Sequence, residues 1–267
     1  MDRAPLGDDE LDAYRTDGFV VLGRILDEPQ RLALLDAEAR HRSPDVFALD
    51  GRTQGLLVTE QLCAQSAALR EFCTAGAHLG AVAQVLGPDV AFTHTQFITK
   101  LPEVDEPGVE EPSRPDDRRT ASWIPLHQDD GYGQLEPPLD VTVWTALTDT
   151  DETNGCLVVV PGSHRDGVLG HRSSEANAVL LEAPAATTPV AVPLRAGEAV
   201  LFSGLTLHGS GPNRSSQPRV GMHARYCHPT VRMVTHRNKP VLADRHSWMV
   251  LGEAPAEVAP VPDGVPG

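Results

Sequence analysis

Apolar residues recur at helical spacing in the first third of the chain. The predicted helical segments are residues 8–17, 28–41 and 66–86, and a short strand is predicted over 19–25. Gly18 follows the first segment and Gly87-Pro88 follows the last, which places a stop signal after each of them. The pattern therefore predicts a helical N-terminal region that is interrupted by a strand.

The pattern changes after Gly87. Short runs rich in β-branched residues follow, bounded by Gly, Pro or Asn, over residues 90–101, 141–147, 156–160, 190–194, 199–202 and 219–227. Runs of this kind are typical of strands that pack into a common core. We therefore predict a mainly β fold with flanking helices, in which a β core follows the helical region.

Two stretches and the C-terminal end lack such patterns. Residues 102–120 are acidic, contain proline and have almost no large apolar side chain, which predicts a surface loop between two strands. A second loop is predicted over residues 172–189, and a flexible tail over 253–267, which is rich in Pro, Ala and Val. Without an internal repeat or a clear linker, residues 1–252 are predicted to form a single domain.

Composition narrows the range of partners. The net charge is −15 and no stretch is rich in Lys or Arg, which argues against a nucleic-acid partner. No apolar stretch approaches the roughly 20 residues that span a bilayer, and the chain starts without a secretory leader, so we expect a cytoplasmic location and no membrane partner. The four cysteines lack Cys-x-x-Cys spacing, which predicts buried free thiols. The expected partner is a small molecule, bound by a monomer or a homodimer.

One short motif carries the strongest chemical signal. His127 and Asp129 stand two residues apart where a predicted strand over 122–126 ends, so both side chains point to the same side. Together with a distant His208, they form the set of two imidazoles and one carboxylate that holds non-haem iron(II) and leaves positions open for other ligands. Arg219 lies eleven residues after His208 and offers a guanidinium fork for the far carboxylate of 2-oxoglutarate.

The motif is short enough to occur by chance, and the chain holds a second copy, His164-Arg165-Asp166. That copy follows a predicted strand end and turn, so we expect His164 to hydrogen-bond within a loop instead. His223 has the strand parity of Arg219 and is a further candidate for the pocket. The remaining histidines are expected to be surface or structural groups.

Five motifs in order resemble one known family. They are HTQFITK at 94–100, PLHQD at 125–129, WTA at 144–146, NGCLVVVPGSH at 154–164 and HGSGPN at 208–213. These residues resemble the phytanoyl-CoA dioxygenase family, whose members are iron(II)- and 2-oxoglutarate-dependent oxygenases on a double-stranded β-helix (jelly-roll, cupin-like) core. The resemblance runs from about Gly18 to Met249.

The resemblance implies roles for particular positions. His127, Asp129 and His208 resemble the iron ligands. Arg219 resembles the arginine that pairs with the C5 carboxylate of 2-oxoglutarate, and Ser210 the hydroxyl beside it. Further co-substrate contacts are implied for Gln96, Trp144 and Thr59, the last of which stands where the family member that this chain most resembles has a lysine. Trp144 also fits a purely structural core position.

Asp130 and Tyr132 follow the ligand pair directly. As loop residues at the rim of the cavity they are expected to touch substrate. Formation of a turn at Asp130-Gly131 explains the presence of these two residues nearly as well.

The expected activity uses Fe(II), 2-oxoglutarate and O2 to hydroxylate an unactivated C–H bond of a small metabolite or natural-product intermediate, with release of succinate and CO2. No catalytic residue is expected beyond the metal ligands. The carboxylate of Asp129 favours oxygenation over halogenation, because related halogenases have a small residue there. Desaturation, ring closure and epoxidation stay open. The alternatives are a non-catalytic metal-binding β-barrel that serves as scaffold or sensor, and a zinc-dependent cupin hydrolase or isomerase.

Overall fold

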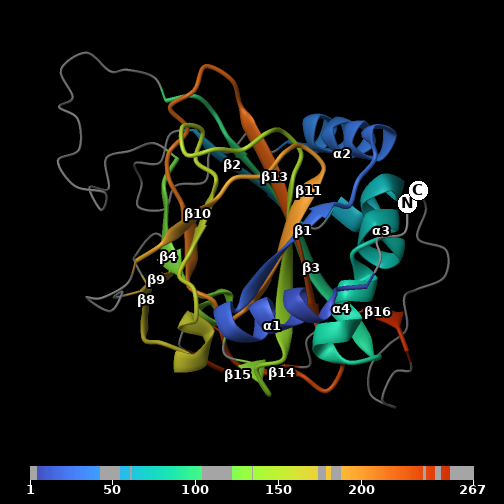
Figure 1. The fold of residues 1–267 in the computed structure, drawn as a ribbon, viewed down its shortest axis with the longest axis vertical. Helices are drawn as coiled ribbons and strands as arrows, with labels where there is room; N and C mark the ends of the chain where they lie inside the picture. The colour runs from blue at the N-terminus through green and yellow to red at the C-terminus, as the bar shows by residue number, and fades with distance from the viewer. Residues whose placement is uncertain are drawn as a thin grey trace.

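Helices lead the chain and strands follow, as the hydrophobic pattern predicts (Figure 1). The computed structural model describes residues 5–42, 55–60, 62–103, 122–133, 135–173, 179–181, 188–236, 239–243 and 248–252. The helical elements are α1 (Asp8–Asp17), α2 (Glu28–His41), η1 (Leu62–Ala64), α3 (Ala67–Ala75), α4 (Leu79–Leu86), η2 (Asp129–Gly131) and η3 (Ser163–Asp166). The strands are β1 (Phe19–Arg24), β2 (Leu56–Glu60), β3 (Val90–Lys100), β4 (Ile124–His127), β5 (Leu135–Glu136), β6 (Asp140–Ala146), β7 (Leu157–Val159), β8 (His171–Ser173), β9 (Val179–Leu181), β10 (Val190–Val192), β11 (Glu198–Ser203), β12 (His208–Ser210), β13 (Arg219–Cys227), β14 (Arg232–His236), β15 (Lys239–Ala243) and β16 (Trp248–Leu251).

Local signals set the helix ends. Helix α2 begins directly after Asp27, whose side chain accepts a hydrogen bond from the backbone N–H of Gln30. Helix α1 ends directly before Gly18, whose φ is 82°. The prediction of one helical run over 66–86 is wrong, because α3 and α4 are separate. Gly76 stands at the break, where an added Cβ would lie 2.4 Å from the Phe72 carbonyl oxygen and would collide with the preceding turn.

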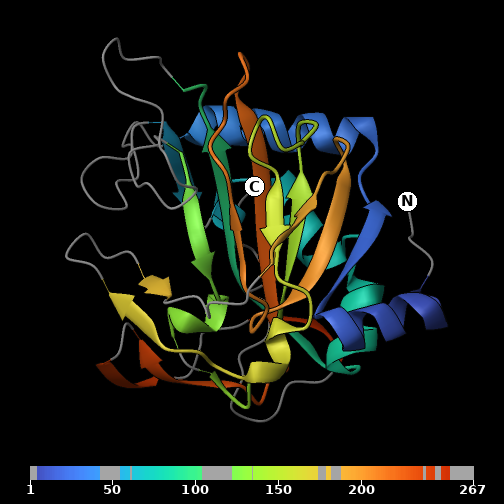
Figure 2. The same ribbon diagram turned by 60° about the vertical axis from the view of Figure 1, so that its left-hand side comes forward.

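The large sheet forms the spine of the fold. Its strands follow the order β1-β11-β6-β13-β3-β16, and β2 pairs with the side of β3. Successive residues of β13 alternate between two environments. Val220, Met222 and Ala224 pack in a core beneath the helices, whereas Arg219 and Arg225 have the opposite parity and face inward. Figure 2 shows α2, α3 and α4 on the outer side of this sheet.

A smaller sheet covers the inner face. Its order is β10-β7-β12-β4, and its apolar residues meet those of the large sheet in a second core. That core holds Trp144 and Phe202 from the large sheet, and Leu157, Val159 and Val192 from the small one. Two facing sheets of this kind make the double-stranded β-helix that the resemblance implies, so this expectation is confirmed.

Three predictions concern segments that the structure describes only in part or not at all. The expected loop over 172–189 contains a two-stranded ladder, β8 with β9, so its described residues correct that prediction. Three-residue apolar runs such as 179–181 are too short to stand out as strands. Most of the expected loop over 102–120 and the whole expected tail over 253–267 lie outside the described residues. Within the described chain, none of the helices has the length and apolar character to cross a bilayer.

Candidate metal centre

Two histidines face each other across neighbouring strands of the small sheet. His127 on β4 and His208 on β12 are directly opposite in register, and their ring centroids are 4.3 Å apart. Both are buried, and the Phe202 ring packs 4.6 Å from that of His208. Cross-strand pairing therefore joins two residues that are 81 positions apart in the sequence.

Backbone carbonyls fix the proton on each ring. Nδ1 of His127 donates to the Pro125 carbonyl at 2.9 Å, and Nδ1 of His208 donates to the Thr206 carbonyl at 2.9 Å. A carbonyl only accepts, so the proton sits on Nδ1 and the Nε2 lone pair of each ring is free. Burial, followed by the neighbouring His208, lowers the pKa of His127 to about 3, which keeps this ring neutral. Neutral imidazoles with an oriented Nδ1 are the form that binds metal ions.

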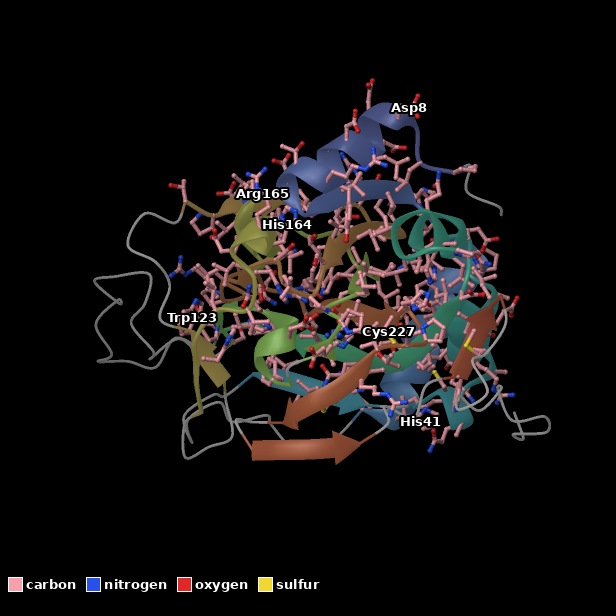
Figure 3. All side chains as sticks on the ribbon, turned by 90° about the horizontal axis from the view of Figure 1, so that it is seen from below. Asp8, His41, Trp123, His164, Arg165 and Cys227 are labelled. Carbon is pink, nitrogen blue, oxygen red and sulfur yellow. The ribbon has the colours of Figure 1, made fainter. Side chains whose placement is uncertain are left out.

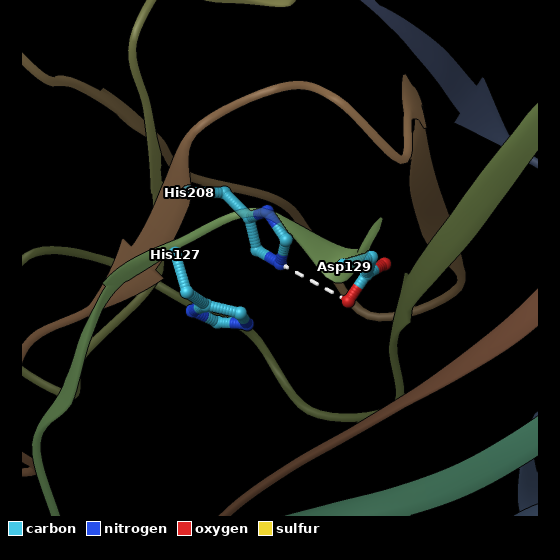
Figure 4. Close-up of side chains that lie close together, drawn as sticks. All are labelled: His127, Asp129 and His208. Carbon is cyan, nitrogen blue, oxygen red and sulfur yellow. Dashed lines mark ion pairs between the residues drawn. The ribbon is translucent and has the colours of Figure 1, made fainter. Parts of the chain in front are cut away.

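Asp129 completes the group (Figure 4). It lies in η2 directly after β4, and one ligand atom from each of His127, Asp129 and His208 can be chosen so that all lie within 4.8 Å of one another. The intervening Gln128 points elsewhere, since its amide donates to the carbonyls of Gly167 and Leu205 at 2.8 and 2.6 Å. The predicted convergence of the three ligands is therefore present in the structure.

The large sheet surrounds the Asp129 carboxylate with polar groups. Thr142 donates through Oγ1 to Oδ2 of Asp129 at 2.5 Å, and Arg225 places Nε 3.7 Å from the same oxygen. Arg225 also pairs with Asp130 at 3.2 Å and with Asp140. Sequence reasoning missed Thr142 and Arg225. The available signal was that Arg225 shares the inward parity of Arg219 on one strand.

The electrostatics of this cluster suit a divalent cation. Burial by itself would raise the pKa of Asp129, but Arg225 and then the nearby histidines lower it well below its ordinary value, so the carboxylate is ionised. Burial and then Asp140 raise the pKa of Asp130. Even with Asp130 neutral, two buried carboxylates face one guanidinium. A metal ion bound by His127, Asp129 and His208 would offset the remaining negative charge, so the residues present fit such a group.

A second charged region lies at the other end of β13. Arg219 is 1% exposed, and its Nη2 donates to the Gly155 carbonyl at 2.9 Å. Its guanidinium lies 5.3 Å above the Trp144 ring. Among the described residues, no carboxylate pairs with it and its Nε has no hydrogen-bond partner. Burial lowers the pKa of Arg219 to about 10, so it still carries its charge at neutral pH.

Lys100 adds a buried amine beside Arg219. The two residues are register partners on β3 and β13, and Nζ of Lys100 donates to the carbonyls of Ser210, at 3.2 Å, and Gly211. Burial and then the Arg219 charge lower the pKa of Lys100. Ser210, expected beside Arg219, has the inward parity of His208 on β12. The buried guanidinium of Arg219, which has no acidic partner among the described residues, is the environment that a small carboxylate would complete.

The other expected co-substrate contacts divide by strand parity. Gln96 and His223 are half-buried register partners with inward parity, and His223 is paired on its other side with Trp144. Thr59 is the register partner of Phe97, which packs in the core beneath the helices. The structure therefore places Thr59 on the face away from the metal centre, which contradicts the expected contact between Thr59 and the co-substrate.

The two residues after the ligand pair also differ from each other. Asp130 is 1% exposed, and its side chain is held by Arg225, so it does not lie at an open rim as predicted. Its raised pKa and its ion pair give it a structural place inside the cluster instead. Tyr132 is half-buried, with its ring 5.5 Å from that of His127 and nearly perpendicular to it. Tyr132 therefore borders the metal centre, as expected of a residue near substrate.

The second His-x-Asp copy serves a different purpose. His164 lies in η3, and its Nε2 contacts the Arg15 carbonyl at 3.2 Å, so it forms a hydrogen bond as expected, but to helix α1 and not within its own loop. Figure 3 shows His164 and Arg165 beside α1 at the edge of the molecule. Among the described residues, the only group of three His, Cys, Asp or Glu with ligand atoms close enough for a metal ion is His127, Asp129 and His208.

The same residues fall inside a match to a known family. A family model described as Phytanoyl-CoA dioxygenase (PhyH) matches residues 14–221, which include the three candidate ligands and Arg219. The peroxisomal phytanoyl-CoA dioxygenase of Bos taurus is 29% identical over 172 residues, 60% of this chain and 47% of that protein. This chain thus spans about half the length of that relative.

Two further similar proteins are matched over more of their own length. The ectoine dioxygenase of Nocardia farcinica (strain IFM 10152) is 28% identical over 240 residues, 79% of this chain and 74% of that protein. The crystal structure of the epimerase SnoN from nogalamycin biosynthesis, in complex with Fe3+, alpha ketoglutarate and nogalamycin RO, aligns with a TM-score of 0.70 at 18% identity. That alignment covers 91% of this chain and 98% of the other, and shows a common fold.

Proposed function

Because this chain belongs to the phytanoyl-CoA dioxygenase family, we propose that it is an Fe(II)- and 2-oxoglutarate-dependent dioxygenase that hydroxylates a C–H bond of a small molecule. The observation that carries the proposal is the convergence of His127, Asp129 and His208, with both Nε2 lone pairs free and the carboxylate ionised. Fe(II) held there would supply positions for 2-oxoglutarate and O2, and would let O2 oxidise 2-oxoglutarate to succinate and CO2.

Arg219 binds the co-substrate in this proposal. The planar guanidinium can meet the C5 carboxylate of 2-oxoglutarate with two parallel hydrogen bonds, and the free Nε supplies one of the donors. Trp144 supports the guanidinium from below, and the hydrogen bond from Nη2 to the Gly155 carbonyl fixes its rotation. Ser210 contributes a hydroxyl on the same inward face.

The remaining residues orient the substrate and keep water out. Phe202 covers the ring of His208, and Tyr132 borders that of His127. His223 has a buried Nε2 without a hydrogen-bond partner among the described residues, so a polar group of a bound molecule can satisfy it. Gln96 lies beside His223 and offers a second polar contact.

We favour a small metabolite or natural-product intermediate over an acyl-CoA. Coenzyme A carries phosphates that basic residues usually bind, and this chain has a net charge of −15. The relatives are named for substrates as different as phytanoyl-CoA and ectoine, so family membership alone does not select one. The buried guanidinium of Arg219 lies in the expected co-substrate region with the Lys100 amine beside it, where it can bind one carboxylate of a small dianion.

The proposal is tested by adding Fe(II) and 2-oxoglutarate without oxygen and recording the visible spectrum, then measuring succinate after air is admitted. We expect a weak charge-transfer band and succinate formation, and expect Asp129→Ala to lose both while its circular dichroism is unchanged. The absence of both signals from the wild-type protein would favour a metal-binding scaffold or sensor. Activity restored by Zn²⁺ but not by Fe(II) would favour the zinc-dependent reading.

A further inference from the structure

We propose that Thr142 and Arg225 are positioning residues that hold one oxygen of Asp129, so that only the other oxygen is presented to the metal. The inference deepens the proposed function, because it concerns the same metal centre. It rests on contacts from the large sheet to a ligand in η2, which follows strand β4 of the small sheet. No role for either residue followed from the sequence motifs.

The two carboxylate oxygens of Asp129 have different contacts. Oδ2 of Asp129 accepts the Thr142 hydroxyl at 2.5 Å and lies 3.7 Å from Nε of Arg225, an ion pair longer than a hydrogen bond. Oδ1 of Asp129 lies 3.8 Å from Nε2 of His208. One oxygen is therefore occupied by the protein, and the other faces the histidine lone pairs.

The holding groups are themselves fixed. Thr142 and Arg225 are directly opposite each other on β6 and β13, two central strands of the large sheet. Arg225 is 7% exposed and contacts Asp130 and Asp140 as well as Asp129. Its position therefore does not depend on Asp129 alone, and it stays in place when Asp129 shares its charge with a metal ion.

The division matters because a carboxylate can bind a metal with one oxygen or with two. A facial set of two histidines and one carboxylate leaves three positions open only if the carboxylate uses one oxygen. Two positions are needed for 2-oxoglutarate and one for O2. Holding Oδ2 away from the metal thus keeps the third position available.

Strand β6 provides a matched pair of threonines for the test. Thr142 faces inward and donates to Asp129, whereas the fully buried Thr145 has the opposite parity and its hydroxyl has no hydrogen-bond partner among the described residues. Thr142→Val and Thr145→Val therefore make the same chemical change on two faces of one strand. Thr142→Ser restores the donor.

The experiment titrates each variant with Co²⁺ without oxygen or co-substrate and records the dissociation constant and the visible spectrum. Loss of a group that orients a metal ligand typically weakens metal binding by about 10- to 100-fold. We expect a loss of that size and a spectrum altered in intensity for Thr142→Val, recovery of most of the affinity in Thr142→Ser, and no change in Thr145→Val. A Thr142→Val protein that binds Co²⁺ like the wild type, with the same spectrum, would overturn the role of Thr142.

Arg225→Lys tests the second residue with the charge retained. Lysine can still neutralise Asp130 and Asp140, so the melting temperature should stay close to that of the wild type, but it lacks the Nε group near Asp129. We expect weaker Co²⁺ binding and the same spectral change. An unaltered spectrum and affinity would limit Arg225 to a structural role.

The two proposals can fail separately. A wild-type protein that binds Co²⁺ through Asp129 but forms no succinate with Fe(II) contradicts the proposed function and leaves the positioning role standing. A wild-type protein that forms succinate while Thr142→Val and Arg225→Lys bind Co²⁺ normally contradicts only the positioning role.

Discussion

Arg219 shows how a single side chain can prepare a site for an anion. It is buried next to Lys100, stacks on Trp144 and has no acidic partner in the described part of the chain. A buried guanidinium without a counter-charge is unfavourable by itself, so binding a carboxylate relieves that cost. Under the proposed function, this relief contributes directly to co-substrate affinity.

Replacing Arg219 by Lys tests this account at the residue scale. The point charge remains but the two-pronged geometry is lost, and one charge-assisted hydrogen bond contributes about 1.5–3 kcal/mol. We expect the KM for 2-oxoglutarate to rise about 10- to 100-fold while kcat changes less, measured by succinate formation. The exposed Arg214, which pairs with Glu103 at 3.8 Å, is the control for an Arg→Lys change. An unchanged KM in Arg219→Lys would contradict the assignment.

The sequence predicted the residues that touch the metal better than those that support them. His127, Asp129 and His208 stand in motifs whose spacing reflects their geometry. Thr142 carries no motif, because its contact with Asp129 depends on how two sheets face each other. Thr59 is expected in the pocket but faces the helix-side core. Neighbouring residues of a strand point to opposite faces, so a difference of one position decides between the two.

The break between α3 and α4 places an ionisable ring inside the helix-side core. His78 is fully buried at this break, and its Nε2 lies 2.7 Å from the Tyr226 hydroxyl of β13. That hydroxyl donates to the Cys73 carbonyl at 3.0 Å, so it accepts from His78. Nδ1 of His78 is then the unprotonated nitrogen, and it has no hydrogen-bond partner among the described residues.

This arrangement predicts sensitivity to acid. Burial lowers the pKa of His78 from 6.5 to about 3, so between these values the unfolded chain binds a proton that the folded chain does not. Stability should therefore decline as the pH falls from about 6.5 toward 3, by up to about 1.4 kcal/mol per pH unit from this group. Urea unfolding of the wild type and of His78→Gln between pH 7 and 4.5 measures the difference. Equal pH slopes in the two proteins would show that His78 does not contribute.

At the level of elements, the apolar pattern located the strands of the β core well. The predicted strand over 219–227 coincides with β13, and the predicted helix over 28–41 coincides with α2. The single helix predicted over 66–86 failed because its apolar residues keep helical spacing through Gly76, where the backbone turns. Contacts between residues that are distant in the sequence determine which strands pair in the two sheets. The local apolar pattern therefore does not predict the pairing.

At the level of the whole molecule, the metal centre joins the two sheets. The histidines belong to the small sheet, while Thr142 and Arg225 reach Asp129 from the large one. A ligand that binds only the folded state stabilises it by about 2.7 kcal/mol at a concentration 100 times its dissociation constant. Metal binding should therefore stabilise the fold as a unit.

We expect Fe(II) at that concentration, without oxygen, to raise the melting temperature by about 5–10 °C for a chain of this size. Differential scanning calorimetry measures the shift, and a chelator should reverse it. Asp129→Ala serves as the control and should show little shift. A wild-type melting temperature that does not respond to Fe(II), Co²⁺ or Ni²⁺ would argue against metal binding at this centre.

The uncompensated charge of Arg219 also bears on how each turnover ends. Under the proposed function, succinate retains a terminal carboxylate like the one that 2-oxoglutarate extends to the guanidinium, and lacks the keto group at its other end. Relief of the buried charge is therefore as available to the product as to the co-substrate. The feature that favours the binding of a diacid co-substrate should thus also favour the binding of succinate, so we expect succinate to compete with 2-oxoglutarate for Arg219.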